Sequence, residues 1–503
     1  MTKEKNKIIL VIILILISLI TLVGSSYALL TKSFKSKKLS MEVGTLKIDF
    51  AEGNAINMAN AAPMTDSNGL KSTPYTFTIT NGGDINAYYT VSNEEELANT
   101  LDTSYLRMKL TGSDGYDSGI KTVKELGTET YKLIDDTLLE TGKSVTYELR
   151  MWISQDAGND IQDKIYKSKI VVNGTSNKLP LATDKILAKA NPENLDYNSA
   201  TDAQKKEMWT FTHEATEQTT ALTDYRYIGA DPNNYVKFND ELWRIIGVFD
   251  TDDGTGKVEK RLKIIRNESI GNYSWDNKDT TTGAETAYGK NEWTDARLNY
   301  LLNPGHESET NGGSLYWNRK SGTCYKGQNN STTSCDFTST GLTDTAKSMI
   351  GDAKWYLGGS STYNDVTPPM FYTRERGTTV YSGHSTSWIG KVGLMYPSDY
   401  GYATSGGSST NRNSCLAKEL YNWDSSGYSD CKNNDWMYNS NIWQWTMSPR
   451  ADNSNRVFDV DAAGYVGSNL AYNTFAGRPV VYLKSTIKVI SGSGTTSSPY
   501  ILG

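Results

Sequence analysis

Four cysteines are the residues with the best defined chemistry in this chain. Cys324, Cys335, Cys415 and Cys431 all lie in the C-terminal half, and four thiols allow three pairings. Pairing between sequence neighbours would join Cys324 to Cys335 and Cys415 to Cys431, and each bridge would stabilise the fold by about 3 kcal/mol. A zinc site would instead need closely spaced thiol pairs such as C-x2-C, whereas the separations here are eleven and sixteen residues and no histidine is near either pair. We therefore predict two disulfides and no metal site.

Few other residues are spaced for catalysis. His213-Glu214 lacks the second histidine of the H-E-x-x-H motif, and Gly383-His384-Ser385-Thr386-Ser387 lacks the final glycine of G-x-S-x-G. Carboxylate pairs for glycoside cleavage could occur among the 57 acidic residues, but the sequence nominates none. We predict no catalytic residues and a non-catalytic protein, with an extracellular glycan-acting hydrolase as the alternative.

Tryptophans in polar, glycine-rich and serine-rich contexts could form platforms on which a sugar or peptide stacks. Trp388, Trp423 and Trp436 have such contexts and are the predicted ligand-binding residues, with burial in a core as the alternative for each. Trp443 and Trp445 are two positions apart, which places both on one face of a strand and predicts that both pack in a core.

The composition restricts the partners and the fold class. A chain of 503 residues with a formal net charge of −6 and a pI near 5.4 has no global basic field, so nucleic-acid binding is not expected. The 43 glycines, 32 tyrosines and 12 tryptophans are typical of many short aromatic strands joined by turns. We predict a mainly β protein with minor α structure.

The first fifty residues predict export. A lysine-rich start precedes the aliphatic run from Ile8 to Val23, and Ser26-Tyr27-Ala28 has the small residues that a signal peptidase recognises. Residues 1–28 are therefore a predicted signal peptide, cleaved after Ala28. A retained membrane anchor is the alternative, because the run is only slightly shorter than the roughly 20 residues of a spanning helix. The predicted location is extracellular or at the cell surface, with the N-terminal segment as the only membrane contact.

Alternating apolar residues predict strands in the next part of the chain. Pro74–Thr80, the turn at Asn81–Asp84 and Ala87–Val91 predict a hairpin, and Tyr147–Ile153 alternates in the same way. A β-sandwich over residues 29–178 accommodates these strands. Residues 179–222 have a different composition and predict a connector with short helices.

Residues 223–503 predict one aromatic-rich domain. Leu242–Phe249 and Leu262–Ile265 predict a hairpin around the acidic turn at 250–256. Two helices are expected where Thr294-Asp295 and Thr343-Asp344 can cap apolar residues at helical spacing.

Two resemblances add to these predictions. The export segment, Val43–Asp49 and Phe77–Gly83 are similar to the TasA/camelysin group of Gram-positive surface proteins, over about residues 1–175. That resemblance implies export by a dedicated signal peptidase and a role in biofilm matrix fibres. The segment Leu39–Phe50, freed by cleavage, would then complete the sandwich of a neighbouring subunit by strand addition. Filament assembly by a chain that begins near Lys71 would contradict this expectation.

The second resemblance covers about residues 223–503 and depends on six segments. These are Tyr227–Gly229, Pro232–Val236, Trp243–Phe249, Gly393–Tyr400, Trp443–Pro449 and Gly477–Leu483. They are similar to an uncharacterised extracellular module of gut Firmicutes that has a C-type-lectin-like fold. This resemblance implies an α+β domain of that fold, while a binding function follows only from analogy between folds.

Calcium would be the cofactor if the domain bound sugars as C-type lectins do, through E-P-N or Q-P-D and W-N-D tripeptides. Asp231–Asn233 and Asn434–Trp436 match these tripeptides only approximately. Asp250–Gly254 is similar to a calcium loop, but its glycine comes one position early, and we interpret it as a hairpin turn. No cofactor is therefore predicted.

The sequence thus predicts a secreted or cell-surface bacterial protein with two parts. The C-terminal domain would be an adhesin that binds a glycan, a peptide or a surface protein, and the N-terminal domain would be of matrix or fibre type. Besides the hydrolase, a purely structural matrix protein is the remaining alternative.

Overall fold

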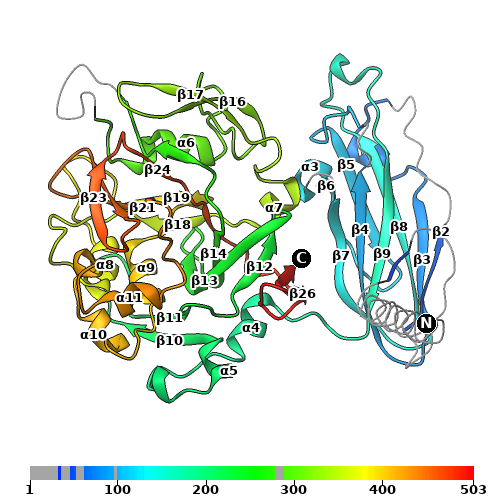
Figure 1. The fold of residues 1–503 in the computed structure, drawn as a ribbon. Helices are drawn as coiled ribbons and strands as arrows, with labels where there is room; N and C mark the ends of the chain where they lie inside the picture. The colour runs from blue at the N-terminus through cyan, green and yellow to red at the C-terminus, as the bar shows by residue number, and fades with distance from the viewer. Residues whose placement is uncertain (1–31, 35–45, 53–61, 96–98, 128–129, 279–287) are drawn as a thin grey trace, which may run out of the picture. The chain divides into compact units, whose positions relative to one another are not determined.

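A computed structural model describes residues 32–34, 46–52, 62–95, 99–127, 130–278 and 288–503 of the chain (Figure 1). The predicted signal segment and its cleavage site at Ala28 lie outside these residues. The chain divides into two compact units, Met1–Leu179 and Pro180–Gly503. Strands predominate over short helices, which confirms the predicted mainly β fold with minor α structure. No helix within the described ranges is long and apolar enough to cross a membrane.

Two sheets form the N-terminal unit. The first has the order β1 (Lys32–Phe34), β9 (Ser168–Thr175), β4 (Ala87–Glu95), β7 (Thr130–Leu139). The second has the order β2 (Ile48–Glu52), β3 (Tyr75–Asn81), β8 (Ser144–Ile153), β5 (Leu106–Gly112), β6 (Lys121–Thr122). Short helical segments lie in the connections between strands: α2 (Asp66–Gly69), α3 (Val123–Leu126) and η1 (Asn159–Ile161).

The core of this unit lies between the two sheets. Phe77 and Ile79 on β3 are buried, as their alternation with threonines predicted, because successive side chains of a strand point to opposite faces. Tyr89 of the first sheet and Tyr147 of the second are also buried, and their hydroxyl oxygens lie 2.5 Å apart. The unit is therefore a β-sandwich.

The predicted hairpin of β3 and β4 is wrong, because the two strands belong to different sheets. β3 pairs with β2 and β8, whereas β4 pairs with β7 and β9. The side-chain amide of Asn81 donates to the carbonyls of Ile85 and Leu139. These two hydrogen bonds hold the connection between β3 and β4 against the end of β7. Alternation predicts which face of a strand is buried, but the pairing partner depends on long-range packing.

The N-terminal segment supplies an edge strand to both sheets. β1 ends the order of the first sheet and β2 ends the order of the second. An edge strand has backbone groups on one side that no strand of its own sheet pairs. Strand addition between subunits would use such edges, and it remains a prediction here.

The C-terminal unit contains a large sheet and a smaller one. The large sheet has the order β20 (Val392–Gly393), β25 (Val480–Tyr482), β14 (Val258–Arg266), β13 (Glu241–Asp252), β12 (Tyr235–Phe238), β27 (Tyr500–Leu502), β26 (Val489–Ser491), with β11 (Leu222–Tyr227) on β13 and β10 (Met208–His213) on β11. The smaller has the order β15 (Asn272–Ser274), β24 (Thr474–Ala476), β21 (Gln444–Pro449), β22 (Arg456–Val460), β23 (Val466–Leu470). Two further pairs are β16 (Ser321–Tyr325) with β17 (Thr332–Asp336) and β18 (Ala353–Tyr356) with β19 (Ser387–Gly390).

Short helices occupy the connections of this unit. They are α4 (Ala182–Leu187), η2 (Tyr197–Ser199), α5 (Asp202–Lys205), η3 (Trp293–Asp295), α6 (Arg297–Leu302), α7 (Asp344–Met349), α8 (Pro368–Glu375), α9 (Pro397–Ala403), α10 (Arg412–Leu416), η4 (Leu420–Asn422) and α11 (Ser429–Asn433). Thr343 caps α7 as predicted, since its side chain accepts from the backbone N–H of Ala346. The predicted hairpin of β13 and β14 is also confirmed.

The residues predicted as a connector pack within the C-terminal unit, which begins at Pro180. Ala182 and Ile186 of α4 and Met208 of β10 are buried in its core. β10 also pairs along its length with β11, which continues the large sheet. The boundary of the compact unit therefore lies about forty residues before the predicted domain start at 223, because a few apolar residues among many polar ones are enough to hold this stretch.

Candidate functional site

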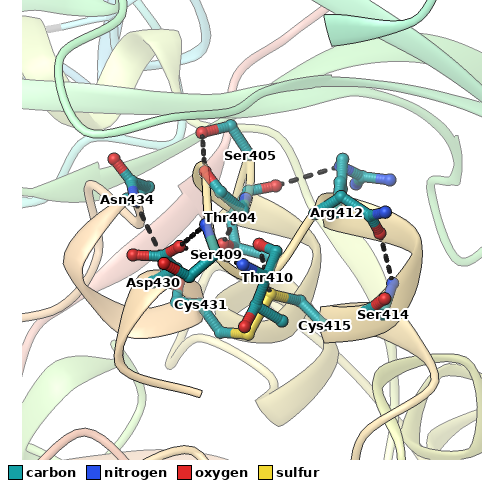
Figure 2. The surroundings of a disulfide bond; sticks show 12 residues. Thr404, Ser405, Ser409, Thr410, Arg412, Ser414, Cys415, Asp430, Cys431 and Asn434 are labelled. Atoms are coloured by element: carbon teal, nitrogen blue, oxygen red, sulfur yellow. Dashed lines mark hydrogen bonds between the residues drawn. A yellow bond between two sulfur atoms is a disulfide. The ribbon is translucent and has the colours of Figure 1, made fainter. Parts of the chain in front are cut away.

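Both predicted disulfides are present. Cys324–Cys335 joins β16 to β17, and Cys415–Cys431 joins α10 to α11. Figure 2 shows the second bridge, where the Asp430 carboxylate accepts from the backbone N–H groups of Ser409 and Thr410 at 2.7 and 3.0 Å. Disulfides of this kind form in oxidising compartments, which agrees with the predicted export.

The structure places two of the three predicted ligand-binding tryptophans in the core. Trp423 has no exposed surface, and its ring packs against Tyr400 with the centroids 5.4 Å apart. Trp436 is 7% exposed, its indole N–H donates to the carbonyl of Tyr227, and its ring lies against the guanidinium of Arg244. Neither ring is placed where a ligand could stack on it, which corrects the prediction for both residues.

Trp388 is half-buried on β19, beside a small hollow. Its ring makes an edge contact with Trp293, and Trp293 lines the hollow together with His384 and Ser385. The hollow leaves essentially no enclosed space for even a water molecule, whereas pockets for small ligands have roughly 300–1,000 Å³. Glu292 accepts from the backbone N–H of Ser385 at 2.7 Å, and so fixes the loop that carries the incomplete serine motif.

Trp443 and Trp445 also have different environments. Trp445 is buried as predicted, but Trp443 is 38% exposed and precedes β21 rather than lying in it. The prediction that both pack in a core is therefore wrong for Trp443. The shared face was inferred from a two-residue spacing, which applies only within a continuous strand.

Two exposed tyrosines and one half-buried tyrosine, from three separate segments, meet at the surface of the C-terminal unit. Tyr363 precedes α8, Tyr421 lies in η4, and Tyr465 precedes β23. The rings of Tyr363 and Tyr421 have centroids 5.2 Å apart, and those of Tyr421 and Tyr465 are 5.4 Å apart, both edge to face. Tyr363 and Tyr421 are 37% and 36% exposed. We call these three residues the tyrosine cluster, and such contiguous exposed rings mark interaction surfaces.

The disulfide-closed loop positions the middle residue of the cluster. Tyr421 lies between Cys415 and Cys431, and its neighbours Leu420 and Trp423 are buried in the core and anchor this loop. The cluster could not be predicted from the sequence, because nothing distinguishes these three from the other 29 tyrosines of the chain. Their two ring contacts join residues that are 58 and 44 positions apart in the chain.

A paired arginine borders the cluster. The Arg450 guanidinium lies 5.1 Å from the ring centroid of Tyr363 and makes a two-point contact of 2.8 and 2.6 Å with the Asp452 carboxylate. It also donates to the hydroxyl of Ser468. Because Asp452 neutralises its charge, Arg450 contributes apolar and hydrogen-bonding surface rather than a free cation.

Two buried aspartates, Asp459 and Asp461, lie close to Tyr465. Burial, together with the neighbouring charge of Asp461, raises the pKa of Tyr465 to about 12, so its hydroxyl keeps its proton. Asp459 is fully buried and accepts from the side-chain amide of Asn469 at 3.0 Å. Burial raises the pKa of Asp459 to about 7, and the charge of Asp461 acts in the same direction.

Asp459→Asn is expected to remove a pH dependence of stability. The unfolded pKa of an aspartate is about 3.9, so the folded protein holds an extra proton between about pH 4 and 7 and loses stability as the pH rises through that range. The loss should be about 3 kcal/mol larger in the wild type than in the variant, in which other buried groups such as Glu375 still titrate. Urea unfolding midpoints at pH 5 and pH 8 measure it, and an unchanged pH dependence in the variant would contradict the assignment.

The zinc and calcium sites considered as alternatives receive no geometric support from the described residues. Among the described residues, no group of three or more His, Cys, Asp or Glu side chains is arranged to hold a metal ion. In the acidic turn, Asp252 accepts from the backbone N–H groups of Gly254 and Gly256, as in an ordinary hairpin turn.

Comparisons with known proteins do not identify this chain. No protein-family model, curated protein or solved structure matches it. The TasA-like and lectin-like assignments therefore stay predictions from the sequence.

Proposed function

We propose that the chain is an exported bacterial surface protein, without catalytic activity, that binds an uncharged glycan through the tyrosine cluster of its C-terminal unit. One observation is the main support: the ring of Tyr421 contacts tyrosine rings from two other distant segments, while Tyr363 and Tyr421 stay more than a third exposed. Folding buries most large aromatic rings of this unit, so exposed rings in mutual contact need another explanation.

The chemistry of the cluster favours a sugar over an anionic ligand. A tyrosine ring offers an apolar face to the C–H groups of a sugar, and its hydroxyl can bond to sugar hydroxyls. Arg450 borders the cluster, but its charge is paired with Asp452, so it is not a free cation that would attract a phosphate or carboxylate.

A glycan hydrolase is the second candidate, because Asp459 and Asp461 lie behind Tyr465. Glycosidases use a pair of carboxyl groups that flank the scissile bond. Asp459 has no exposed surface and Asp461 is 5% exposed, so neither is open to a substrate in this conformation. Binding without cleavage is therefore the preferred function.

The N-terminal unit completes the proposal as a matrix or fibre domain. Its sandwich has an edge strand from the N-terminal segment in both sheets, which suits strand addition between subunits. The two disulfides support a location outside the cytoplasm.

Tyr421→Ala should abolish most glycan binding. The full chain would be applied to an array of bacterial and host glycans, with and without calcium chloride, and the affinity for any positive sugar would be measured for both proteins. We expect a loss of about tenfold or more, since a central aromatic residue of an interface contributes roughly 1–2 kcal/mol or more.

Tyr116→Ala is the matched control, because Tyr116 is 37% exposed, close to the 36% of Tyr421, but lies in the N-terminal unit. Saturable binding that Tyr421→Ala leaves intact would refute the site. Release of a cleaved sugar would favour the hydrolase instead, and a folded protein that binds nothing on the array would favour a purely structural role.

A further inference from the structure

A lysine and an aspartate lie in contact inside the core of the C-terminal unit. The side chains of Lys263, on β14, and Asp399, on α9, are 0% and 1% exposed, and Lys263 Nζ lies 2.5 Å from Asp399 Oδ2. The two residues are 136 positions apart in the chain. Four aromatic rings have centroids within 6 Å of this Nζ: Phe249, Trp355, Tyr396 and Tyr482.

We propose that Lys263 and Asp399 condense to an intramolecular amide, which covalently joins β14 to α9. The bond that forms is between Nζ and Cγ, and the bond that breaks is between Cγ and Oδ2. Of the three ammonium protons, two leave with Oδ2 as water and one stays on the amide nitrogen. The reaction balances without an oxidant, a reductant or any other reactant.

Nζ of Lys263 lies close to the distance from which it could attack Cγ of Asp399. Oδ2 is bonded to Cγ, so Nζ lies within about 3.7 Å of the carboxyl carbon, near the roughly 3–3.5 Å of reacting atoms held for attack. Backbone and side-chain donors hold the carboxylate in place: Tyr396 N–H donates to Oδ2 at 2.9 Å and Arg226 Nη1 donates to Oδ1 at 3.0 Å.

Arg226 is placed to stabilise the intermediate. When Nζ adds to Cγ, negative charge develops on Oδ1, which is the oxygen that the guanidinium of Arg226 contacts. Arg226 also contacts Asp224 at 2.8 Å, so it stays paired after Asp399 has lost its charge. Arg226 is therefore a positioning and charge-stabilising residue for the condensation.

The pKa of Lys263 and the burial of both side chains favour formation of the amide. Burial lowers the pKa of Lys263 to about 8, so the neutral amine, which is the nucleophilic form, is accessible near neutral pH. Lys263 and Arg226 hold the pKa of Asp399 below its usual range against the effect of burial, so activation requires a proton to move from Nζ to Oδ2 along their contact. The amide is neutral, and its formation removes two charges whose burial is costly.

Mass spectrometry of the purified full chain tests the amide. After reduction and denaturation, protease digestion should yield a branched peptide that contains both Lys263 and Asp399, with a mass lower by one water than the sum of the two linear peptides. Lys263→Met and Asp399→Ala should abolish it. Lys260→Met is the matched control, because Lys260 lies on the same strand, pairs with Asp250 at the surface at 3.0 Å, and should leave the branched peptide unchanged.

Two outcomes would overturn the proposal. One is recovery of the two linear peptides in full yield from folded wild-type protein. The other is water loss found only in linear peptides with Asp114-Gly115 or Asp253-Gly254, where an aspartate can cyclise onto the following glycine nitrogen. The wild-type digest decides between these results even if a variant does not fold. The proposal does not depend on glycan binding.

Discussion

Asp399→Ala is expected to destabilise the C-terminal unit by about 3–5 kcal/mol. The Asp399 carboxylate contacts the buried cations Lys263 and Arg226 and the backbone N–H of Tyr396. Without this carboxylate, the ammonium of Lys263 stays in an aromatic interior with no contacting anion. An uncompensated buried charge of this kind strongly destabilises the folded state. Where the amide has formed, the substitution also removes a covalent link, so the loss would be larger.

Urea unfolding followed by tryptophan fluorescence measures this effect, because eleven of the twelve tryptophans lie in the C-terminal unit. Asp250→Ala is the control. The Asp250 carboxylate pairs with Lys260 at 3.0 Å, but the two side chains are 24% and 40% exposed. Such surface pairs contribute about 0–1 kcal/mol. Equal losses of unfolding free energy in Asp399→Ala and Asp250→Ala would show that burial does not increase the contribution of the Asp399 ion pair to stability.

Trp423→Ala is expected to cost about 3–5 kcal/mol of stability. The ring is fully buried against Tyr400, so its removal leaves a cavity under the disulfide-closed loop. The same unfolding assay measures the loss. Trp443→Ala is the matched control, since this ring is 38% exposed and its removal should cost about 1 kcal/mol or less.

The comparison of these two variants also tests the role of the predicted ligand-binding tryptophans. If Trp423 were a ligand platform, Trp423→Ala would weaken binding and leave the unfolding midpoint nearly unchanged. Polar neighbours in the sequence made Trp423 similar to a surface residue. Its burial results from contacts with residues such as Tyr400, which the sequence context does not reveal.

Several features could be predicted because they depend on residues close in the chain. The cysteine pairs are 11 and 16 positions apart, and short loops favour pairing between neighbours. Thr343 caps its helix through an atom three residues away. The hairpin of β13 and β14 follows from two apolar runs on either side of an acidic turn.

Other features could not be predicted because they join distant residues. β3 and β4 alternate as a hairpin should, yet each pairs with strands from elsewhere in the chain. Lys263 lies in the apolar run of β14, where a lysine gives no sign of its partner on α9.

The sequence by itself determined the mainly β class, the disulfides and the local turns and caps, since short-range hydrogen bonding, loop closure and side-chain periodicity act over a few residues. Only the tertiary structure decided which aromatic rings are buried, that Tyr363, Tyr421 and Tyr465 meet at the surface, and that Lys263 contacts Asp399. The physical reason is that burial and contact depend on the elements packed around a residue, and those elements come from distant parts of the chain.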